Sequence, residues 1–518
     1  MVRKSKIGRL VGVALVALLS AGCATHSQRT EQSLHHFVQG DVDQALVFFE
    51  RHNAGRNRYL HLLEAGRMRQ LSGDFAGSRR AFDQVIEHVI VREEGAVIRL
   101  RDVGGVTLAG TLTDDRMRPF VLAYFETVML FVAQAMNHWM LGEPEAAWVQ
   151  LRRAAAVQDL WRQEAAERQQ ELPDDEARQE YLEKSMERFR EQSTDLIATA
   201  ARVANSQENP FAWYLAGVMF EHQDDMNGSY QAFRRASEMM PDNHTFRRDY
   251  LRLGVRVHRP EYLPKLERYG IQVADLETPA SEVLVVFDEA LISRRRVERI
   301  PIFTGTWQMF NLPFYSDPPH QPASLQVRID GGAEERLQPA VYVQSLAYRD
   351  LQEQMNGVML RNITRAVARQ VAYSASQQSE AALVNLLGLL FNITTLIADS
   401  ADTRSWYTLP MTVQLARLPV EPGERTLRIT HVGTGREHQV DLTAAQGQLQ
   451  LVWVADLGSR SQVAWAGLDR SLPGHAVESA SILGHISRGN DGALVSSSRE
   501  RTLINESMTD RDVKEESE

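Results

Sequence analysis

The chain has a single cysteine, and the residues before it point to covalent modification of its thiol. Cys23 is the only cysteine among 518 residues. It follows basic residues between Arg3 and Arg9, the apolar stretch 10–19, and the small residues 20–22. This order is typical of a secretory signal, and a cysteine directly after Ala-Gly is typical of a lipobox. We therefore expect cleavage before Cys23 and attachment of lipid to its thiol.

This interpretation predicts where the protein resides. Residues 1–22 would be the lipoprotein signal peptide and residues 23–30 a lipidated tether. Two or more acyl chains hold a protein stably at a membrane, so Cys23 would anchor the chain without a spanning helix. Ala24, in place of Asp, favours the periplasmic face of the outer membrane. The alternative is an ordinary signal peptide with an incidental cysteine, although a free thiol is unusual in an oxidising compartment.

We find no catalytic or cofactor-binding signature in the sequence. There is no His-Glu-x-x-His pair, and no second cysteine for a thiolate metal site. The run 433–435 is Gly-Thr-Gly without the third glycine or the following helix of a dinucleotide-binding loop, so we interpret it as a hairpin turn. The sequence therefore predicts a protein that is not an enzyme, with no cofactor and no metal site.

The segment 399–410 combines two acids, an arginine and two aromatic residues. In a functional interpretation Asp402, Arg404 and Trp406 form a ligand loop for a sugar or peptide, with Trp406 as a platform. In a structural interpretation Asp402 pairs with Arg404, and Trp406 closes the core. We favour the structural interpretation.

The composition excludes some classes of partner. The chain has 67 acidic and 57 basic residues, for a net charge of −10. Removal of the basic signal peptide would leave the mature chain more acidic still. A nucleic-acid binder would show a basic surface, and so would a general binder of anionic lipid. Hydrophobic residues make up 43% of the chain, which is ordinary for folded domains.

The first half of the chain predicts helical repeats. Trp213, Gly217 and Phe233, followed by Pro241, match the tetratricopeptide pattern of aromatic and small residues. Small residues suit a close crossing of two antiparallel helices, and Pro241 would end the second helix.

Weaker copies of the pattern precede this one. They include Gly66 with Phe82, and Gly142 with Ala147. We therefore predict a tetratricopeptide-like superhelix over residues 31–255, with a generic helical bundle as the alternative. Such superhelices bind peptides or partner proteins on a concave face.

The second half predicts a β-rich domain. After a linker at 256–280, residues 281–456 carry strand patterns, with a helical insert at about 348–400. The strands we expect include 283–287, 324–329, 341–343 and 449–454, and a hairpin of 426–432 with 438–442. The apolar stretch 381–398 would be a buried helix or, less readily, a membrane contact. This order suggests an α+β domain, mostly an antiparallel β-sandwich with inserted helices. Residues 457–518 are polar and predict a mostly disordered tail.

The whole pattern resembles a known family. The segments that carry the resemblance are 73–82, 125–129, 141–147, 209–217, 401–410 and 415–419. They are similar to those of a poorly characterised family of proteobacterial lipoproteins with a lipobox, irregular tetratricopeptide repeats and a β-rich C-terminal domain. Genes of this family are described near those for a lipoprotein activator of peptidoglycan synthases, so the resemblance implies work in the cell envelope.

We therefore expect a membrane-anchored scaffold lipoprotein. It would bind envelope proteins through the repeat groove, in envelope assembly or peptidoglycan regulation. One alternative is a lipoprotein whose C-terminal domain binds or modifies carbohydrate, namely peptidoglycan. Another is a pilotin-like factor for secretion or pilus assembly.

Overall fold

The structure is a computed structural model that describes most of the chain between residues 26 and 469. The described ranges are 26–52, 54–99, 119–167, 176–276, 279, 281–303, 307–315, 317–330, 332, 334–376 and 401–469. Cys23, the apolar stretch 381–398 and residues 470–518 lie outside them. None of the helices in these ranges combines the length and the apolar character that crossing a bilayer requires.

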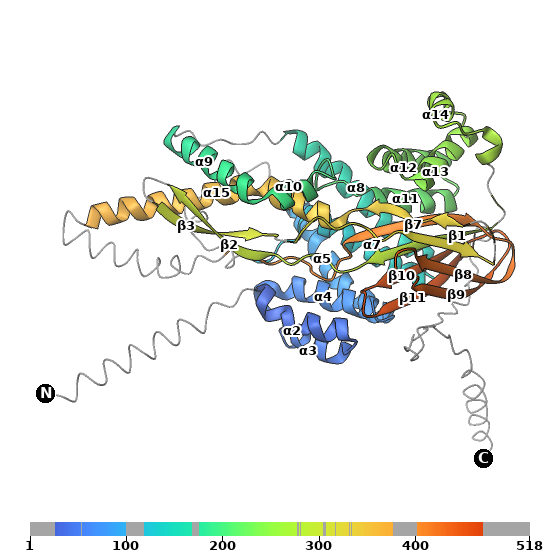
Figure 1. Ribbon diagram of the computed structural model, residues 1–518, viewed down its shortest axis with the longest axis horizontal. Helices are drawn as coiled ribbons and strands as arrows, with labels where there is room; N and C mark the ends of the chain where they lie inside the picture. Colours follow the sequence, from blue (N-terminus) through green and yellow to red (C-terminus); the bar gives the residue numbers. More distant parts are fainter. Residues whose placement is uncertain are drawn as a thin grey trace, which may run out of the picture.

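The described chain mixes helices and sheets, with helices first (Figure 1). The helices of the first half are α2 (His26–Gln39), α3 (Val42–Arg51), α4 (Arg58–Gln70), α5 (Phe75–Arg99), α7 (Tyr124–Met140), α8 (Pro144–Glu167), α9 (Glu176–Gln192), α10 (Thr194–Ala200), α11 (Pro210–His222), α12 (Met226–Met239) and α13 (His244–Arg256). Because α2 begins at His26, the tether predicted over 23–30 is helical from that residue on. The predicted linker contains α14 (Leu263–Tyr269) and short 3₁₀ turns.

Four helix pairs are joined by the same turn. The turns carry a left-handed residue, with φ of 96° at Gly40, 84° at Gly73, 73° at Gly142 and 59° at Asp224. In each turn this residue's N–H donates to the carbonyl three residues back, and the next N–H donates to the carbonyl five residues back. These two bonds define the Schellman end of a helix. One helix–turn–helix unit therefore recurs as α2/α3, α4/α5, α7/α8 and α11/α12.

Glycine–phenylalanine pairs hold two of these units together. A Cβ atom added at Gly66 would lie 2.5 Å from the Phe82 ring, and one added at Gly217 would lie 2.6 Å from the Phe233 ring. Both rings are fully buried, and the same sequence separation joins the partners in both pairs. The Ser229 hydroxyl also donates to the Gly217 carbonyl at 2.9 Å. The glycines therefore let paired helices approach closely.

Three other residues of the predicted repeat pattern have structural roles as well. Ala147 is fully buried in α8, and Trp213 is buried in α11. Pro241 follows the end of α12 at Met239, as its missing N–H requires.

The second half forms three sheets. Their strands are β1 (Glu282–Glu289), β2 (Arg296–Phe303), β3 (Trp307–Phe314), β4 (Leu325–Ile329), β5 (Glu335–Arg336), β6 (Gln338–Val341), β7 (Thr412–Pro419), β8 (Gly423–His431), β9 (Glu437–Ala444), β10 (Gln448–Asp456) and β11 (Ser461–Asp469). The main sheet has the order β11-β10-β1-β7-β6, the cover sheet has the order β5-β4-β8-β9, and β2 and β3 form a separate ribbon. The pairing is antiparallel except between β1 and β10, which run parallel.

The main sheet is buried on both faces. Val283, Val285 and Phe287 of β1 belong to a hydrophobic cluster shared with the cover sheet. Leu284 and Val286 belong to the larger cluster that includes the helices. A strand covered on both faces has a continuous run of apolar residues. The structure thus confirms the strand predicted at 283–287.

Some predicted boundaries differ from the structure. The strand expected at 341–343 ends at Val341, and the 34-residue helix α15 (Val343–Ser376) begins directly after it. The segment predicted as a tail from residue 457 contains β11, which completes the main sheet. β11 is rich in alanine and glycine, and it is held by its ladder with β10.

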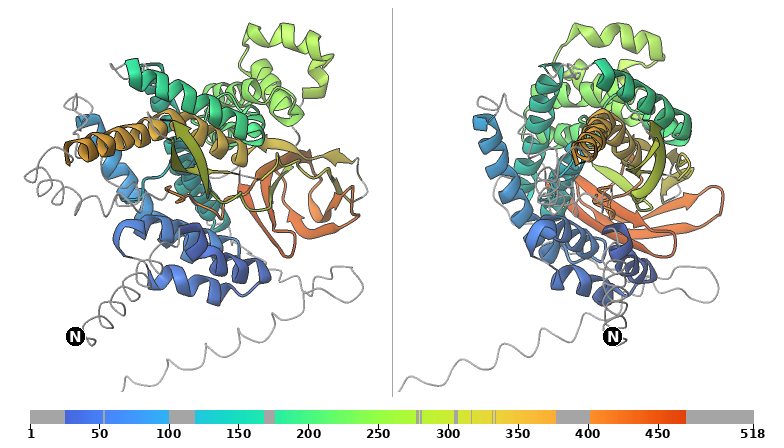
Figure 2. Two further views of the ribbon diagram at one scale, coloured as in Figure 1. Left: turned by 60° about the vertical axis from the view of Figure 1, so that its left-hand side comes forward. Right: turned by 90° about the vertical axis from the view of Figure 1, so that its left-hand side faces the viewer.

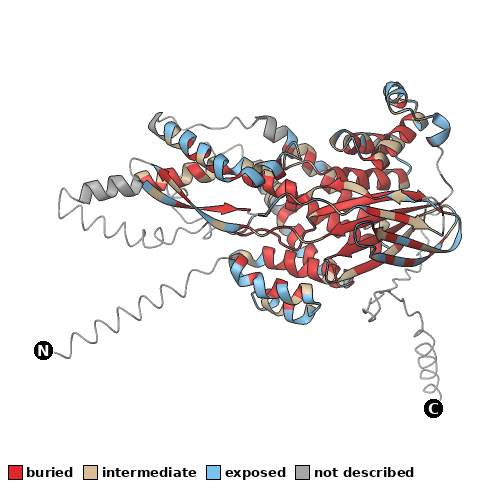
Figure 3. Cartoon of the chain, viewed as in Figure 1, coloured by how far each residue is buried: buried red, intermediate tan, exposed pale blue. Residues whose placement is uncertain are grey.

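The helical array curves around the second half of the chain. In Figure 2 the helices from α2 to α13 form an arc, and the main sheet and α15 lie inside it. The inner helices α4, α7 and α11 are buried on nearly every side (Figure 3). The outer helices α5, α8 and α12 cover one side of these inner helices, and the sheets and α15 cover the other side. The concave face of the array is therefore occupied by the chain's own second half.

The glycine–phenylalanine crossing makes a prediction about stability. Gly217→Ala should lower the free energy of unfolding by about 1–3 kcal/mol, because overpacking against Phe233 forces the helices apart. Gly357→Ala in α15 is the matched control, since its Cβ would meet only the flexible end of Arg361 at 3.4 Å. That change should stabilise by up to about 1 kcal/mol.

Chemical denaturation of both variants measures the difference. Adding Phe233→Leu to Gly217→Ala should recover part of the loss. Equal unfolding midpoints for Gly217→Ala and Gly357→Ala would contradict the close crossing.

Candidate functional site

In the segment predicted as a possible ligand loop, the described residues 401–410 are almost all buried. Trp406 has no exposed surface. Its indole Nε1 donates to the Thr408 hydroxyl at 2.9 Å, and its ring lies edge-on to Phe82 with centroids 5.6 Å apart. The Arg404 guanidinium donates to Asp402 at 2.8 Å and to Asn57 at 3.2 Å. This placement fits the structural interpretation of the segment, because Trp406 offers no open face to a sugar.

Two buried glutamates of the inner helices hold this segment by its backbone. Glu126 of α7 accepts hydrogen bonds from the Trp406 N–H at 2.8 Å and from the Ser405 hydroxyl at 3.0 Å. Glu64 of α4 accepts from the Tyr407 N–H at 2.7 Å and from the Thr408 N–H at 3.1 Å. Backbone donors that have no strand partner are satisfied in this way.

The environment of Glu64 is electrostatically unfavourable for a charge. Burial raises the pKa of Glu64 to about 8, although the hydrogen bonds from Thr408 and Tyr407 act in the opposite direction. The carboxyl group of Glu64 thus gives up hydration in order to hold the segment against α4.

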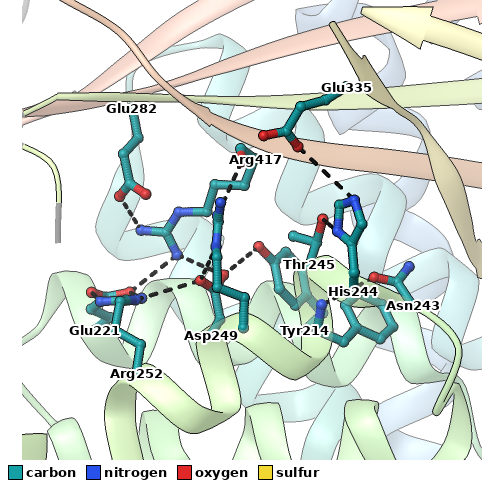
Figure 4. A network of polar contacts seen from close by, with 12 residues as sticks. Tyr214, Glu221, Asn243, His244, Thr245, Asp249, Arg252, Glu282, Glu335 and Arg417 are labelled. Carbon is teal, nitrogen blue, oxygen red and sulfur yellow. Dashed lines mark hydrogen bonds and ion pairs between the residues drawn. The ribbon is translucent and has the colours of Figure 1, made fainter. Parts of the chain in front are cut away.

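The largest polar cluster joins the helices to the main sheet (Figure 4). Arg417 of β7 is fully buried, and its Nη2 donates to Glu282 of β1 at 2.5 Å. Its Nη1 donates to Glu221 of α11 at 3.2 Å and to Asp249 of α13 at 3.1 Å. The Tyr214 hydroxyl also donates to Asp249 at 2.8 Å. One guanidinium therefore bridges two helices and two strands.

Further arginines balance the negative charge of this Arg417 cluster. Arg252 donates to both oxygens of Glu221, at 2.6 and 2.8 Å. Arg248 lies 3.6 Å from Asp249, and its guanidinium donates to the Arg417 carbonyl at 3.0 Å. The cluster thus brings together three guanidinium groups and three carboxylates, from Arg248, Arg252, Arg417, Glu221, Asp249 and Glu282.

Two carboxylates of the cluster, those of Glu221 and Asp249, are held in the charged form. Burial alone would raise the pKa of Glu221, but Arg417 and Arg252 outweigh burial and lower it to about 2. Burial would raise the pKa of Asp249 too, and the same arginines hold it far below its usual range. Paired buried charges of this kind join structural elements, and one charge left without its partner would be costly.

Two smaller clusters join other elements. Arg67 of α4 donates to Asp288 of β1 at 2.5 Å, and the Trp453 indole donates to the same carboxylate at 3.0 Å. Arg295 donates to the Tyr315 hydroxyl at 3.0 Å and to Asp350 of α15 at 3.3 Å. Burial raises the pKa of Asp350 to about 7, with Arg295 opposing the rise.

One group in the described residues has the chemistry of a metal site, and the sequence analysis missed it. His431 of β8, His438 of β9 and Asp456 of β10 are buried, and one ligand atom of each lies within 4.8 Å of the others. The metal sites considered from the sequence were a histidine pair at helical spacing and a thiolate site. The signal it missed is a pair of histidines at inward positions on both strands of the predicted hairpin.

Comparison with known proteins gives no relative from which a role could be carried over. No protein-family model matches the chain, and no curated protein or solved structure matches it either.

The Arg417 cluster makes a quantitative prediction. Arg417→Met should lower the free energy of unfolding by about 3–5 kcal/mol, because it leaves buried carboxylates without their partner. Arg425→Met is the matched control on β8. Arg425 pairs with Asp330 at 3.6 Å and Glu421 at 3.4 Å near the surface, so its loss should cost less than about 1 kcal/mol.

Urea unfolding of the two variants beside the unaltered chain measures both effects. If Arg417→Met costs no more than Arg425→Met, the cluster does not hold the helices to the sheet.

Proposed function

We propose that this protein is a lipid-anchored scaffold of the periplasmic face of the outer membrane. It binds partner proteins in envelope assembly or peptidoglycan regulation. In this proposal the helical array is a tetratricopeptide-like superhelix, and the main and cover sheets form a β-sandwich. The glycine–phenylalanine crossing shared by α4/α5 and α11/α12, within a helix–turn–helix unit that occurs four times, supports the repeat assignment.

The anchor would hold the folded body close to the membrane. Cys23 lies three residues before the start of α2 at His26. Three residues of chain span at most about 10 Å. A lipidated Cys23 would therefore keep α2 at the lipid surface.

The docking surface that we propose differs from the concave groove expected from the sequence. The inner helices that would line that groove are buried under the main sheet and α15. The ribbon of β2 and β3 is the better candidate, because large apolar side chains on it are exposed. Phe303 is 41% exposed, Trp307 62% and Met309 58%. Exposed apolar patches of this kind are typical of protein-binding sites.

The ribbon is held in place by neighbouring helices. α15 contacts β3, and α9 contacts β2. The Arg188 guanidinium of α9 lies 5.0 Å from the centre of the Trp307 ring. One face of this indole is thus positioned by a cation–π contact, and a large part of the side chain remains open to a partner.

The carbohydrate-binding alternative has lost its candidate platform. Its proposed site depended on an open Trp406 ring, and that ring is buried against Phe82. The pilotin-like alternative differs from the scaffold proposal only in the identity of the partner, so capture of the partner distinguishes the two.

Photo-crosslinking in intact cells tests the proposal. A photoreactive residue at Trp307 should capture an envelope protein, because this side chain is exposed on the ribbon. The same residue at Val432, which is 51% exposed in the turn after β8, is the matched control and should capture little. A Cys23→Ser chain should fail to incorporate palmitate and should give weaker capture at Trp307.

The captured protein then decides the role. A peptidoglycan synthase or its regulator supports the scaffold proposal, and a secretin or pilus subunit supports the pilotin-like alternative. Equal capture at Trp307 and Val432 would contradict the ribbon as the docking surface. Palmitate labelling of Cys23→Ser would contradict the anchor.

A further inference from the structure

Two histidines lie at one end of the buried face of the cover sheet, which is otherwise apolar. Along β9 every second residue is buried, beginning with His438 and continuing with Val440 and Leu442. On β8 the buried face carries Ile429 and then His431. His438 pairs directly with Ile429, so His431 is its diagonal neighbour on the same face. The cover sheet therefore places both imidazoles side by side on its buried face, at the end near the hairpin turn.

A carboxylate from the facing sheet completes the group. Asp456 ends β10, and its Oδ1 accepts a hydrogen bond from the Gly458 N–H at 2.9 Å. Its Oδ2 lies 3.3 Å from His431 Nε2 and 3.8 Å from His438 Nε2. The two Nε2 atoms are 3.2 Å apart. Three strands from two sheets thus direct three ligand atoms toward one point.

Hydrogen bonding alone does not satisfy these contacts. If His431 Nε2 carries a proton for Asp456, it cannot accept from the Arg436 guanidinium, whose Nη2 lies 3.2 Å away. If His431 Nε2 is unprotonated, its lone pair faces the Asp456 carboxylate. A neutral imidazole has one donor and one acceptor nitrogen, so either arrangement leaves one contact unfavourable. A cation between the three atoms would accept a lone pair from each.

The spacing fits a small tetrahedral ion. Zinc binds histidine nitrogen and carboxylate oxygen at about 2.0–2.2 Å in tetrahedral geometry, which places neighbouring ligand atoms about 3.3–3.5 Å apart. The three measured separations, 3.2, 3.3 and 3.8 Å, bracket that range. Two imidazoles with one carboxylate suit zinc, whereas magnesium and calcium prefer oxygen ligands at higher coordination number.

Arg436 supplies the positive charge in the metal-free arrangement. Its Nη2 contacts Asp456 Oδ2, and its Nη1 donates to the Gly458 carbonyl at 2.9 Å. Arg436 precedes β9 at the end of the hairpin turn, and its side chain is 37% exposed. The guanidinium can therefore turn toward solvent when another cation takes its place.

We propose that His431, His438 and Asp456 bind one zinc ion between the main and cover sheets, and that Arg436 competes with zinc for this position. Three protein ligands leave the fourth tetrahedral position for water. The ion would link β8 and β9 to β10. The inference does not depend on the proposed scaffold role.

Zinc titration of the full chain, purified in detergent and stripped with a chelator, tests this inference. A chromophoric zinc indicator in competition should report one zinc per chain. His431→Asn and Asp456→Asn should each weaken affinity more than about 100-fold, since each removes a ligand. Arg436→Gln should raise affinity about tenfold or more, because it removes the competing cation.

The Arg436 variant separates a metal site from an ordinary buried ion pair. If Arg436 and Asp456 form only an ion pair, Arg436→Gln should lower the melting temperature of the protein, and zinc should not restore it. The metal site predicts that zinc, but not magnesium, raises the melting temperature of Arg436→Gln above that of the unaltered chain in zinc.

The chain has 15 histidines, and a control variant accounts for those outside the site. His36→Asn, on α2 and far from the site in sequence, should leave zinc binding unchanged. Absence of stoichiometric binding in both the unaltered chain and Arg436→Gln would overturn the proposal. Binding that survives His431→Asn and Asp456→Asn would overturn it too.

Discussion

A buried arginine cannot remain without carboxylate partners, and Arg417 is buried completely in the main sheet. Its partners come from α11, α13 and β1, which are far apart in the sequence. Breaking one member of such a group leaves an uncompensated charge at a cost of several kcal/mol. The helical array and the main sheet therefore have to assemble together for either half to be stable. Arg67 with Asp288 extends the same requirement along the array. Hydrogen bonds from the segment 401–410 to Glu64 and Glu126 add further polar contacts between the helices and the second half.

The joint assembly of the helical array and the main sheet limits which surface of the proposed repeats can bind a partner. A superhelix with a free concave face would be a docking groove. Here the chain's own second half fills the inside of the arc (Figure 2). Helix pairs that pack on their own sheet leave the concave face covered, so a partner would have to use the outer surfaces. The proposed docking site is therefore the exposed ribbon of β2 and β3.

Local pattern was enough to predict many of the elements. Alternation and apolar runs predicted the strands at 283–287, 324–329 and 449–454, because side chains on a strand face opposite sides with a period of two. The tetratricopeptide spacing predicted the contact between Gly217 and Phe233, since both lie within one helix pair.

Contacts between distant segments were not predictable in this way. Nothing around Arg417 in the sequence names Glu221 or Asp249 as its partners. The burial of Trp406 depends on Phe82, a residue of the first half. The alanine-rich strand β11 carries little strand signal and is defined by its ladder with β10. The contact between His431 and His438 depends on the exact hairpin register, which places both on one face.

Native-state hydrogen exchange tests most directly the claim that both halves form one folding unit. The slowest-exchanging amides of α7 and α11 should have the same free energy of opening as those of β1, β7 and β10, and added denaturant should lower all of them together. If the strands open at a clearly lower free energy than the inner helices, the sheet is a separate unit and the concave face can become free.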